Sequence, residues 1–165
     1  MAEATSTQDV VIERDFDAPA ELVWQMWTMP EHFAAWYGPD GVTIAVAELD
    51  VRVGGVRRVR MDMTTPDGTR EMWFTGTHLE VAAPTRLVYT ESMADADGNV
   101  LRPEDVGMPA GHPMTTEVHV DLEPLGPRTK VTLTHVGIPA DSPGAAGWLM
   151  AFAKLATHLQ ARAGR

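Results

Sequence analysis

Hydrophobic and polar positions alternate through most of the chain and recur with a helical period near its two ends. Residues 10–16 (VVIERDF) alternate in this way and predict a first strand, and further alternating runs lie between Val42 and Val136. Turn sequences rich in proline and glycine, such as EPLGPRT, separate these runs. The middle of the chain is therefore predicted to form antiparallel strands joined by short turns.

Two short helices are predicted after the first strand. Asp17 and Pro19 stand where an N-cap and a first-turn proline belong, and Pro30 ends the segment that they open. Residues 30–38 (PEHFAAWYG) then predict a second short helix, which closes at Gly38.

A longer helix is predicted at the C-terminus, where Ser142 supplies the N-cap and Pro143 the first-turn proline. Its apolar positions follow in steps of four, three and four residues, which place them in one stripe opposite a polar side. The stripe consists of Trp148, Phe152, Leu155 and Leu159, and the polar side of Lys154, His158 and Arg162. This element order predicts an α+β fold, with one antiparallel sheet and helices on one face.

The turns also set the pairing of the strands, because a period of two must put one set of side chains inside. The turn TTPDGT places Val59, Met61 and Trp73 on the apolar face, with Arg58 and Arg60 outside. The pairs predicted around the other two turns are Leu122 with Val131, Val120 with Leu133, Val118 with His135, Val81 with Leu87, Leu79 with Tyr89 and Thr77 with Glu91.

These registers leave three polar residues on the apolar face, namely Tyr89, Glu91 and His135, while His78 falls outside. An unpaired Glu91 against a packed helix would cost several kcal/mol, and a cavity or a partner would relieve that cost. The alternatives are a register that is off by one residue, or a Glu91 at the open end of its strand in water.

The stretch DVRVGGVRRVRM (50–61) poses a separate question, since glycines beside cationic side chains also occur in phosphate-binding loops. Such a loop leads into a helix N-terminus, whereas alternating strand residues follow here. We therefore interpret Gly54 and Gly55 as a turn between two strands, where a positive φ is cheap. Asp50 and Arg52 are placed to brace that turn by hydrogen bonds or an ion pair.

Composition narrows the functional classes. The chain has 165 residues, 44% of them hydrophobic, which suits a single domain, expected over residues 8–162. Its net charge of −10 argues against a nucleic-acid partner and against docking on anionic lipid. The absence of cysteine excludes a disulfide framework, a thiolate nucleophile and cysteine-ligated zinc.

The N-terminus lacks secretory-signal features and no apolar run approaches the ~20 residues that span a bilayer, so we expect a cytoplasmic protein without membrane insertion.

Metal sites find little support in the sequence. None of the six histidines pairs with another at helical i,i+4 or strand i,i+2 spacing. The sequence DADGN resembles the start of a calcium loop, but its glycine is fourth instead of sixth, and Val106 stands where that loop needs a glutamate. No nucleotide-binding motif and no serine nucleophile elbow occurs. We therefore expect neither a metal nor a cofactor.

Several segments together resemble a known family. The chain contains, in the order found in the SRPBCC superfamily, FDAPAELVWQMWTMPEHFAAWYGP, ELDVRVGGVRRVRM, GTHLEVAAPTRLVYTE, GPRTKVTLTH and GAAGWLMAFAKLATHL. More narrowly, these segments resemble the heat-shock-protein-90 ATPase activator-like branch of the START-like proteins. The resemblance covers roughly residues 10–162 and implies a helix-grip fold. In that fold a curved seven-stranded antiparallel sheet wraps around a long C-terminal helix, two short helices follow the first strand, and a hydrophobic cavity lies between sheet and helix.

The family is functionally mixed, so the resemblance implies the fold far better than the function. The leading hypothesis is binding of a small hydrophobic molecule, lipid-, sterol- or polyketide-like, in that cavity, without established catalysis. The second is a co-chaperone-like module that acts on a heat-shock ATPase in the stress response. The third is an enzyme of the cyclase or dehydratase type. A monomer and a homodimer are both compatible with the sequence.

Inward positions rich in methionine and tryptophan are the candidates for the ligand site, because methionine repacks around ligands of different shape. The alternative is that each of them only fills the core. Glu91, His135 and Tyr89 are also the candidates for acid–base chemistry, since a carboxylate and an imidazole would meet over an apolar floor, although His135 could serve the structure alone. The candidate ligand-binding residues are Met61, Trp73, Tyr89, Glu91, Met93, Met114, Thr116, Val118, His135, Trp148 and Phe152.

Residues 94–113 form a stretch that is longer and richer in proline and glycine than a plain hairpin connection. Loops of about this length inside a compact domain are usually functional or disordered. We interpret the stretch as a lid over the mouth of the cavity, with Met108 and His112 as ligand contacts. The alternative is a simple surface excursion.

Overall fold

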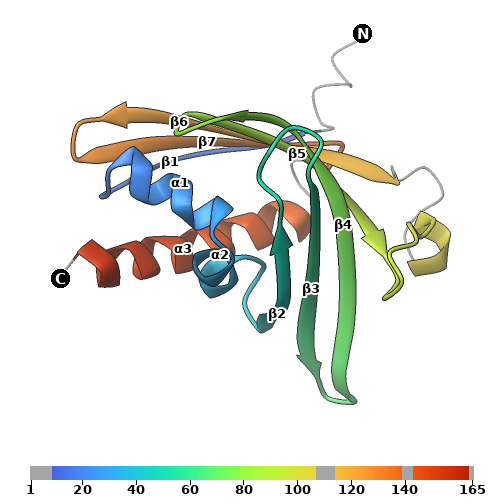
Figure 1. The fold of residues 1–165 in the computed structure, drawn as a ribbon. Coiled ribbons are helices and arrows are strands. Elements are labelled where there is room, and N and C mark those ends of the chain that lie inside the picture. The colour runs from blue at the N-terminus through green and yellow to red at the C-terminus, as the bar shows by residue number, and fades with distance from the viewer. Residues whose placement is uncertain (1–8, 107–113, 139–142, 164–165) are drawn as a thin grey trace, which may run out of the picture.

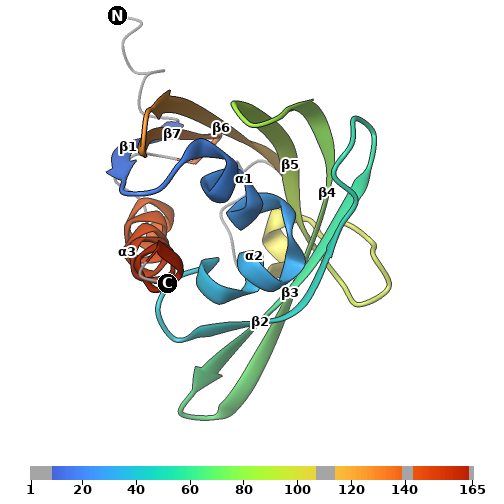
Figure 2. The same ribbon diagram turned by 60° about the vertical axis from the view of Figure 1, so that its left-hand side comes forward.

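The computed structural model describes residues 9–106, 114–138 and 143–163. Its strands form one seven-stranded antiparallel sheet in the order β1-β7-β6-β5-β4-β3-β2. The sheet is strongly curved and α1, α2 and α3 lie on its hollow side, with α3 seen nearly end-on in Figure 2 and the β3–β4 hairpin extending beyond the helices in Figure 1. The elements are β1 (Asp9–Phe16), α1 (Ala20–Thr28), α2 (Pro30–Trp36), β2 (Val42–Leu49), β3 (Val56–Thr65), β4 (Gly68–Ala82), β5 (Arg86–Ala94), η2 (Pro103–Val106), β6 (Thr115–Leu125), β7 (Arg128–Val136) and α3 (Pro143–Ala163).

This arrangement confirms the predicted α+β, helix-grip architecture. Two short helices follow the first strand, and the long C-terminal helix α3 lies inside the curve of the sheet. Across residues 9–106, 114–138 and 143–163, no helix combines the length and the hydropathy that a membrane-spanning segment needs. Ser142, predicted to cap α3, and Met108 and His112, predicted to contact a ligand, lie outside the described residues.

The apolar stripe of α3 is buried as predicted, since Trp148, Phe152, Leu155 and Leu159 are all core residues. Burying a large apolar side chain stabilises a fold by roughly 1.5–3 kcal/mol, so the stripe is the main anchor of the helix. The predicted polar side is only partly in water, because two of its residues contact the α2 region. Lys154 donates to the Pro39 carbonyl at 3.2 Å, and the rings of His158 and His32 approach to 3.1 Å between nitrogens.

The start of α1 differs from the prediction. Pro19, not Asp17, occupies the N-cap position, where its backbone is extended and no side chain caps the helix. The Pro19 carbonyl accepts the amides of Leu22 and Val23 at 3.0 and 3.1 Å. The helix therefore begins one residue after the proline, because the proline still has the extended backbone that an N-cap requires.

The hairpin registers are partly confirmed. β6 and β7 pair as predicted through Leu122–Val131, Val120–Leu133 and Val118–His135. β4 and β5 pair as predicted at Val81–Leu87, but a β-bulge between His78 and Glu80 then shifts the register. An extra residue on one strand reverses the faces of those beyond it.

The bulge exchanges the predicted positions of two neighbouring side chains. His78 pairs with Tyr89 and is 1% exposed, whereas Leu79, predicted inside and opposite Tyr89, is 41% exposed. The prediction failed here because it counted β4 as a regular strand, and the bulge adds one residue to that count.

Trp73 also lies on the face opposite to the predicted one. It pairs with Arg60 on the outer, convex face of the sheet, while Phe74 pairs with Val59 on the inner face. The guanidinium of Arg58 lies 4.3 Å from the centroid of the Trp73 ring. A cation over an aromatic ring is favourable, and this contact gives the tryptophan a partner outside the core.

The glycine pair forms a turn between β2 and β3, as predicted. Gly54 has a φ of +85°, and Arg52 bonds the Asp50 carboxylate at 2.9–3.0 Å. The turn is also tied to β4, since the His78 amide donates to the Gly55 carbonyl at 2.9 Å and the Gly54 amide donates to the His78 carbonyl at 2.8 Å. These bonds occupy the backbone groups that a phosphate cradle would need.

Gly55 is required for space, because a Cβ added there would lie 2.0 Å from the Asp50 carbonyl oxygen. We expect Gly55→Ala to lower the free energy of unfolding by about 2 kcal/mol or more, as in other overpacked sites. Gly147→Ala is the matched control, because its Cβ would meet only Pro39 at 3.7 Å within α3. It should raise stability by about 0.5–1 kcal/mol. Urea denaturation measures both, and equal effects would contradict this interpretation of the turn.

Two histidines make stability depend on pH. Burial, with Arg57 nearby, lowers the pKa of His78, and burial, with His32 and Arg162, lowers the pKa of His158. As the pH falls through the ordinary histidine pKa of about 6.5, these two histidines therefore take up protons in the unfolded chain before they do so in the folded protein. We expect the free energy of unfolding to fall from about pH 7.5 to about pH 5.5, and to fall less in His78→Gln and His158→Gln. An equal fall in the wild type and both variants would refute these assignments.

Candidate functional site

The inner face of the sheet gathers most of the predicted site residues. Cross-strand pairs join Phe74 with Met93, Glu91 with Thr116, and Tyr89 with Val118. Met61 and His135 lie on the same face, and Trp148 and Phe152 belong to the core cluster that α3 shares with it. Two predicted residues lie elsewhere: Trp73 on the outer face, as described above, and Met114 just before β6, where it is 47% exposed.

A buried ion pair lies at the centre of this face. Nη1 of Arg57 approaches Oε2 of Glu91 to 3.5 Å, and the side chains are 2% and 12% exposed. Gly76 stands opposite Arg57 on the intervening strand β4. Because glycine has no side chain, Arg57 reaches across β4 to Glu91 on β5.

Three aromatic rings enclose the guanidinium of Arg57. Its central carbon lies 3.8 Å from the ring centroid of Tyr89, 5.4 Å from that of Phe33 and 5.8 Å from that of Tyr37. Burial by itself would lower the pKa of Arg57, but Tyr89, Tyr37 and Glu91 outweigh burial, so this pKa is raised. The arginine is therefore a permanent buried cation, which the sequence analysis did not identify. The sequence did contain one signal: Arg57 stands two residues before the buried Val59, so both side chains lie on the same face of β3.

Two tyrosine hydroxyls extend this arrangement. Tyr37, which follows α2, donates to Oε2 of Glu91 at 3.3 Å, and its oxygen lies 2.6 Å from the Tyr89 hydroxyl. Since the Tyr37 proton is directed to the carboxylate, the Tyr89 hydroxyl donates to Tyr37. Burial is the main reason why the pKa of both tyrosines is raised, and both hydroxyls stay protonated.

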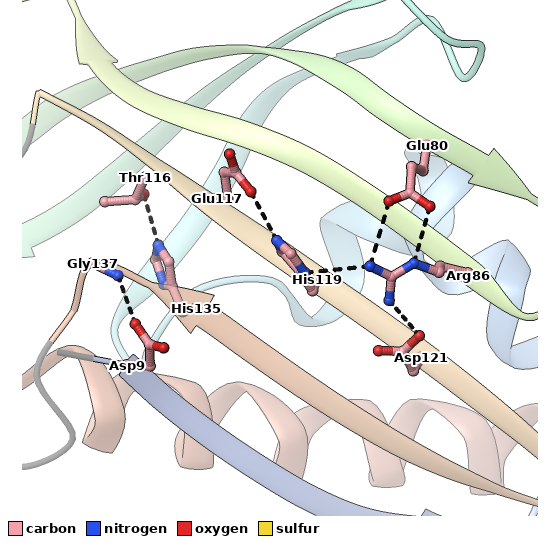
Figure 3. Close-up of polar contacts among 9 residues, drawn as sticks. All are labelled: Asp9, Glu80, Arg86, Thr116, Glu117, His119, Asp121, His135 and Gly137. Carbon is pink, nitrogen blue, oxygen red and sulfur yellow. Dashed lines mark hydrogen bonds and ion pairs between the residues drawn. The ribbon is translucent and has the colours of Figure 1, made fainter. Parts of the chain in front are cut away.

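His135 takes part in a second chain of hydrogen bonds, of which Figure 3 draws the contact with Thr116. The indole of Trp148 donates to Nδ1 of His135 at 2.9 Å, and Nε2 of His135 lies 2.8 Å from the Thr116 hydroxyl. Because an indole N–H only donates, Nδ1 accepts and the proton resides on Nε2. Thr116 in turn donates to the backbone carbonyl of Glu91 at 3.2 Å. Both ring nitrogens of His135 are thus engaged in one neutral tautomer, which favours a structural role for this residue over acid–base chemistry.

The neighbouring residues on the same strands form a different network on the outer face (Figure 3). Arg86 bonds Glu80 at 3.1 Å and Asp121 at 2.6 Å, and His119 bonds Glu117 at 2.8 Å. The Arg86 side chain is 34% exposed, so solvent weakens these pairs, which resemble ordinary surface salt bridges. The candidate site is therefore the inner cluster, defined as Tyr37, Arg57, Tyr89, Glu91, Thr116, His135 and Trp148.

Beside the inner cluster lies an apolar surface on the inner face of β4 and β5. Its side chains Met72, Phe74 and Met93 are partly exposed. The helices lie mainly over other strands, with α3 on β1, α2 on β2, and α1 on β6 and β7. One open groove of about 460 Å³ lies away from this surface, between α2 and α3, and is lined by Ala35, Ala153, Lys154, Thr157, His158 and Ala161.

The ion pair should be a strongly coupled element of stability. Glu91→Met leaves the buried guanidinium without its counter-charge, and we expect a loss of about 3–5 kcal/mol in the free energy of unfolding. The double variant Arg57→Met, Glu91→Met removes both charges and should be clearly more stable than the single variant. Chemical denaturation of the wild type, the two single variants and the double variant measures the coupling. Additive effects would show that the two charges do not depend on each other.

Several proteins of known structure share this fold. A comparison with curated proteins gives no match. A protein from Nitrosomonas europaea has a similar structure, with a TM-score of 0.75 at 21% identity over 95% of this chain and 97% of that chain. A protein from Chromobacterium violaceum has a TM-score of 0.72 at 26% identity over 91% and 95% of the two chains. An AHSA1 protein from Silicibacter pomeroyi has a TM-score of 0.71 at 21% identity over 93% and 99%.

A likeness at 21% identity shows the fold alone, and the family follows from the sequence match. The family described as activator of Hsp90 ATPase homolog 1-like protein matches residues 17–160. That range begins just before α1 and ends within α3, so it contains the inner cluster. The chain therefore belongs to the family of activator of Hsp90 ATPase homolog 1-like proteins.

Proposed function

We propose that the protein binds a small hydrophobic molecule on the inner face of its sheet, against β4 and β5. The observation that carries this proposal is the partly exposed apolar surface formed by Met72, Phe74 and Met93 beside the inner cluster. Unbranched methionine side chains adapt to ligands of different shape. An apolar surface flanked by a few convergent polar groups is the usual composition of a ligand site.

Covering the apolar surface of this face would supply the binding free energy. Apolar surface removed from water contributes roughly 25 cal/mol per Å², and a ligand on this face would cover side chains that the helices leave partly open. The buried side of the same face, with Val59 and Val118, is already packed in the core. The ligand would therefore extend an existing core and would not require a new one.

The family suggests a second candidate function, a co-chaperone-like module acting on a heat-shock ATPase. Its support is the family match over residues 17–160. The cyclase or dehydratase hypothesis has less support, because His135 accepts from Trp148 and donates to Thr116 and so offers no free nitrogen for proton transfer to a substrate. Ligand binding remains the function that the geometry supports best.

Neighbouring residues on β4 provide a matched test of the proposed surface. Phe74 faces inward opposite Val59, and Trp73 faces outward opposite Arg60. We expect Phe74→Asn to weaken binding of 2-naphthol and 1-decanol by about tenfold or more, since apolar contact area is lost, and Trp73→Asn to leave binding unchanged. Isothermal titration calorimetry measures both, with the unfolding temperature as a check on folding. No binding of either probe to the wild type, or equal losses in the two variants, would contradict the proposal.

A further inference from the structure

The inner cluster directs its hydroxyl, indole and imidazole donors to protein acceptors and leaves an acceptor open. We propose, on the basis of the proposed function above, that the ligand is a neutral alcohol or phenol whose hydroxyl group donates to the Glu91 carboxylate. Its apolar body would lie on Met72, Phe74 and Met93. The inference concerns the chemical class that this site selects, beyond hydrophobicity.

The hydroxyl, indole and imidazole donors of the cluster are already engaged. Tyr89 donates to Tyr37, and Tyr37 donates to Oε2 of Glu91. In the second chain Trp148 donates to His135, whose Nε2 proton is directed to Thr116. The Thr116 hydroxyl ends this chain at the Glu91 carbonyl. A ligand that only accepts hydrogen bonds would therefore find no free hydroxyl, indole or imidazole donor in these two chains.

Glu91 is the group with remaining capacity. A carboxylate has two oxygens and about four acceptor positions, and the contacts from Arg57 and Tyr37 both fall on Oε2. Within residues 9–106, 114–138 and 143–163, Oε1 has no hydrogen-bond partner. Glu91 is also 12% exposed, compared with 2% for Arg57, so the carboxylate and not the guanidinium is the accessible end of the ion pair.

The position of Glu91 connects this acceptor to the apolar surface. Glu91 and Met93 are two residues apart on β5 and share its inner face, which separates their Cα atoms by about 7 Å. Met93 pairs with Phe74 on β4. A molecule with two fused rings is long enough to rest on Met93 and Phe74 while its hydroxyl reaches Glu91.

Charge and hydrogen bonding disfavour the other ligand classes. A ligand carboxylate would meet the accessible negative charge of Glu91, while Arg57 lies behind the rings of Tyr89, Phe33 and Tyr37. An ether or ester would desolvate the carboxylate without donating to it, and an unpaired buried charge is costly. An ammonium would add a second cation beside an ion pair that is already balanced. A ligand hydroxyl donates a hydrogen bond to Glu91 without adding a charge to the site.

Three probes that share one ring system test the inference. We expect 2-naphthol to bind the wild-type protein at least about tenfold more tightly than 2-methoxynaphthalene or naphthalene-2-carboxylate at neutral pH, because only the naphthol donates to a charged acceptor. Isothermal titration calorimetry provides the dissociation constants. In Glu91→Gln the preference over the ether should shrink to less than about threefold, because an amide also donates. Trp73→Asn, an outer-face variant that keeps the carboxylate, should retain the preference.

The outcomes separate the inference from the function on which it rests. If the ether or the carboxylate binds as tightly as 2-naphthol, the inference is wrong while binding at the inner face stands. If no probe binds, both fail. A preference for 2-naphthol that persists in folded Glu91→Gln would remove Glu91 from the role assigned to it. Should Glu91→Gln not fold, the comparison of the three probes on the wild type decides alone.

Discussion

A charged guanidinium inside an apolar core is the constraint on which the rest of the inner face depends. Taking Arg57 out of water costs several kcal/mol unless an opposite charge and polar contacts compensate for it. The compensation comes from Glu91 on β5 and from the rings of Phe33, Tyr37 and Tyr89. Because Phe33 belongs to α2 and Tyr37 follows it directly, the arginine on β3 is satisfied only when the end of α2 lies over the sheet.

The polar contacts also fix orientation, which apolar packing alone does not. Hydrophobic burial is non-directional, so the stripe of α3 anchors the helix but leaves it some freedom to shift along the inner face. The indole of Trp148 prevents this, because it has a single N–H and that group is directed to Nδ1 of His135 on β7. His135 in turn contacts Thr116 on β6, which reaches the backbone of Glu91. The two hydrogen-bond chains thus meet at Glu91. Together they fix the positions of α2, α3 and the strands β3, β5, β6 and β7 relative to one another.

The features that could be predicted from the sequence are those with local causes. The spacing of apolar residues in α3 defines its buried stripe, and the turn EPLGPRT defines the register of β6 and β7 over their whole length. The features that escaped prediction depend on contacts between distant residues. Leu79 is displaced to the outside by a bulge, and Trp73 finds its partner Arg58 on another strand. Arg57 could have been assigned to the inner face by parity, but nothing nearby in the chain indicates the aromatic rings that enclose it.

In the proposed function, the polar groups of the inner face have two roles: they hold the surrounding elements in place, and they select the class of ligand. The curved sheet and the stripe of α3 position the inner face, and proteins with 21–26% identity share this overall fold. The direction of the hydrogen bonds on that face is a property of a few side chains, because Tyr37 and Trp148 donate and the Glu91 carboxylate only accepts. Exchanging a donor and an acceptor as a matched pair at these positions would reverse the polarity presented to a ligand while every buried polar group keeps a partner. Chains of this fold can thus differ in ligand class without differing in architecture.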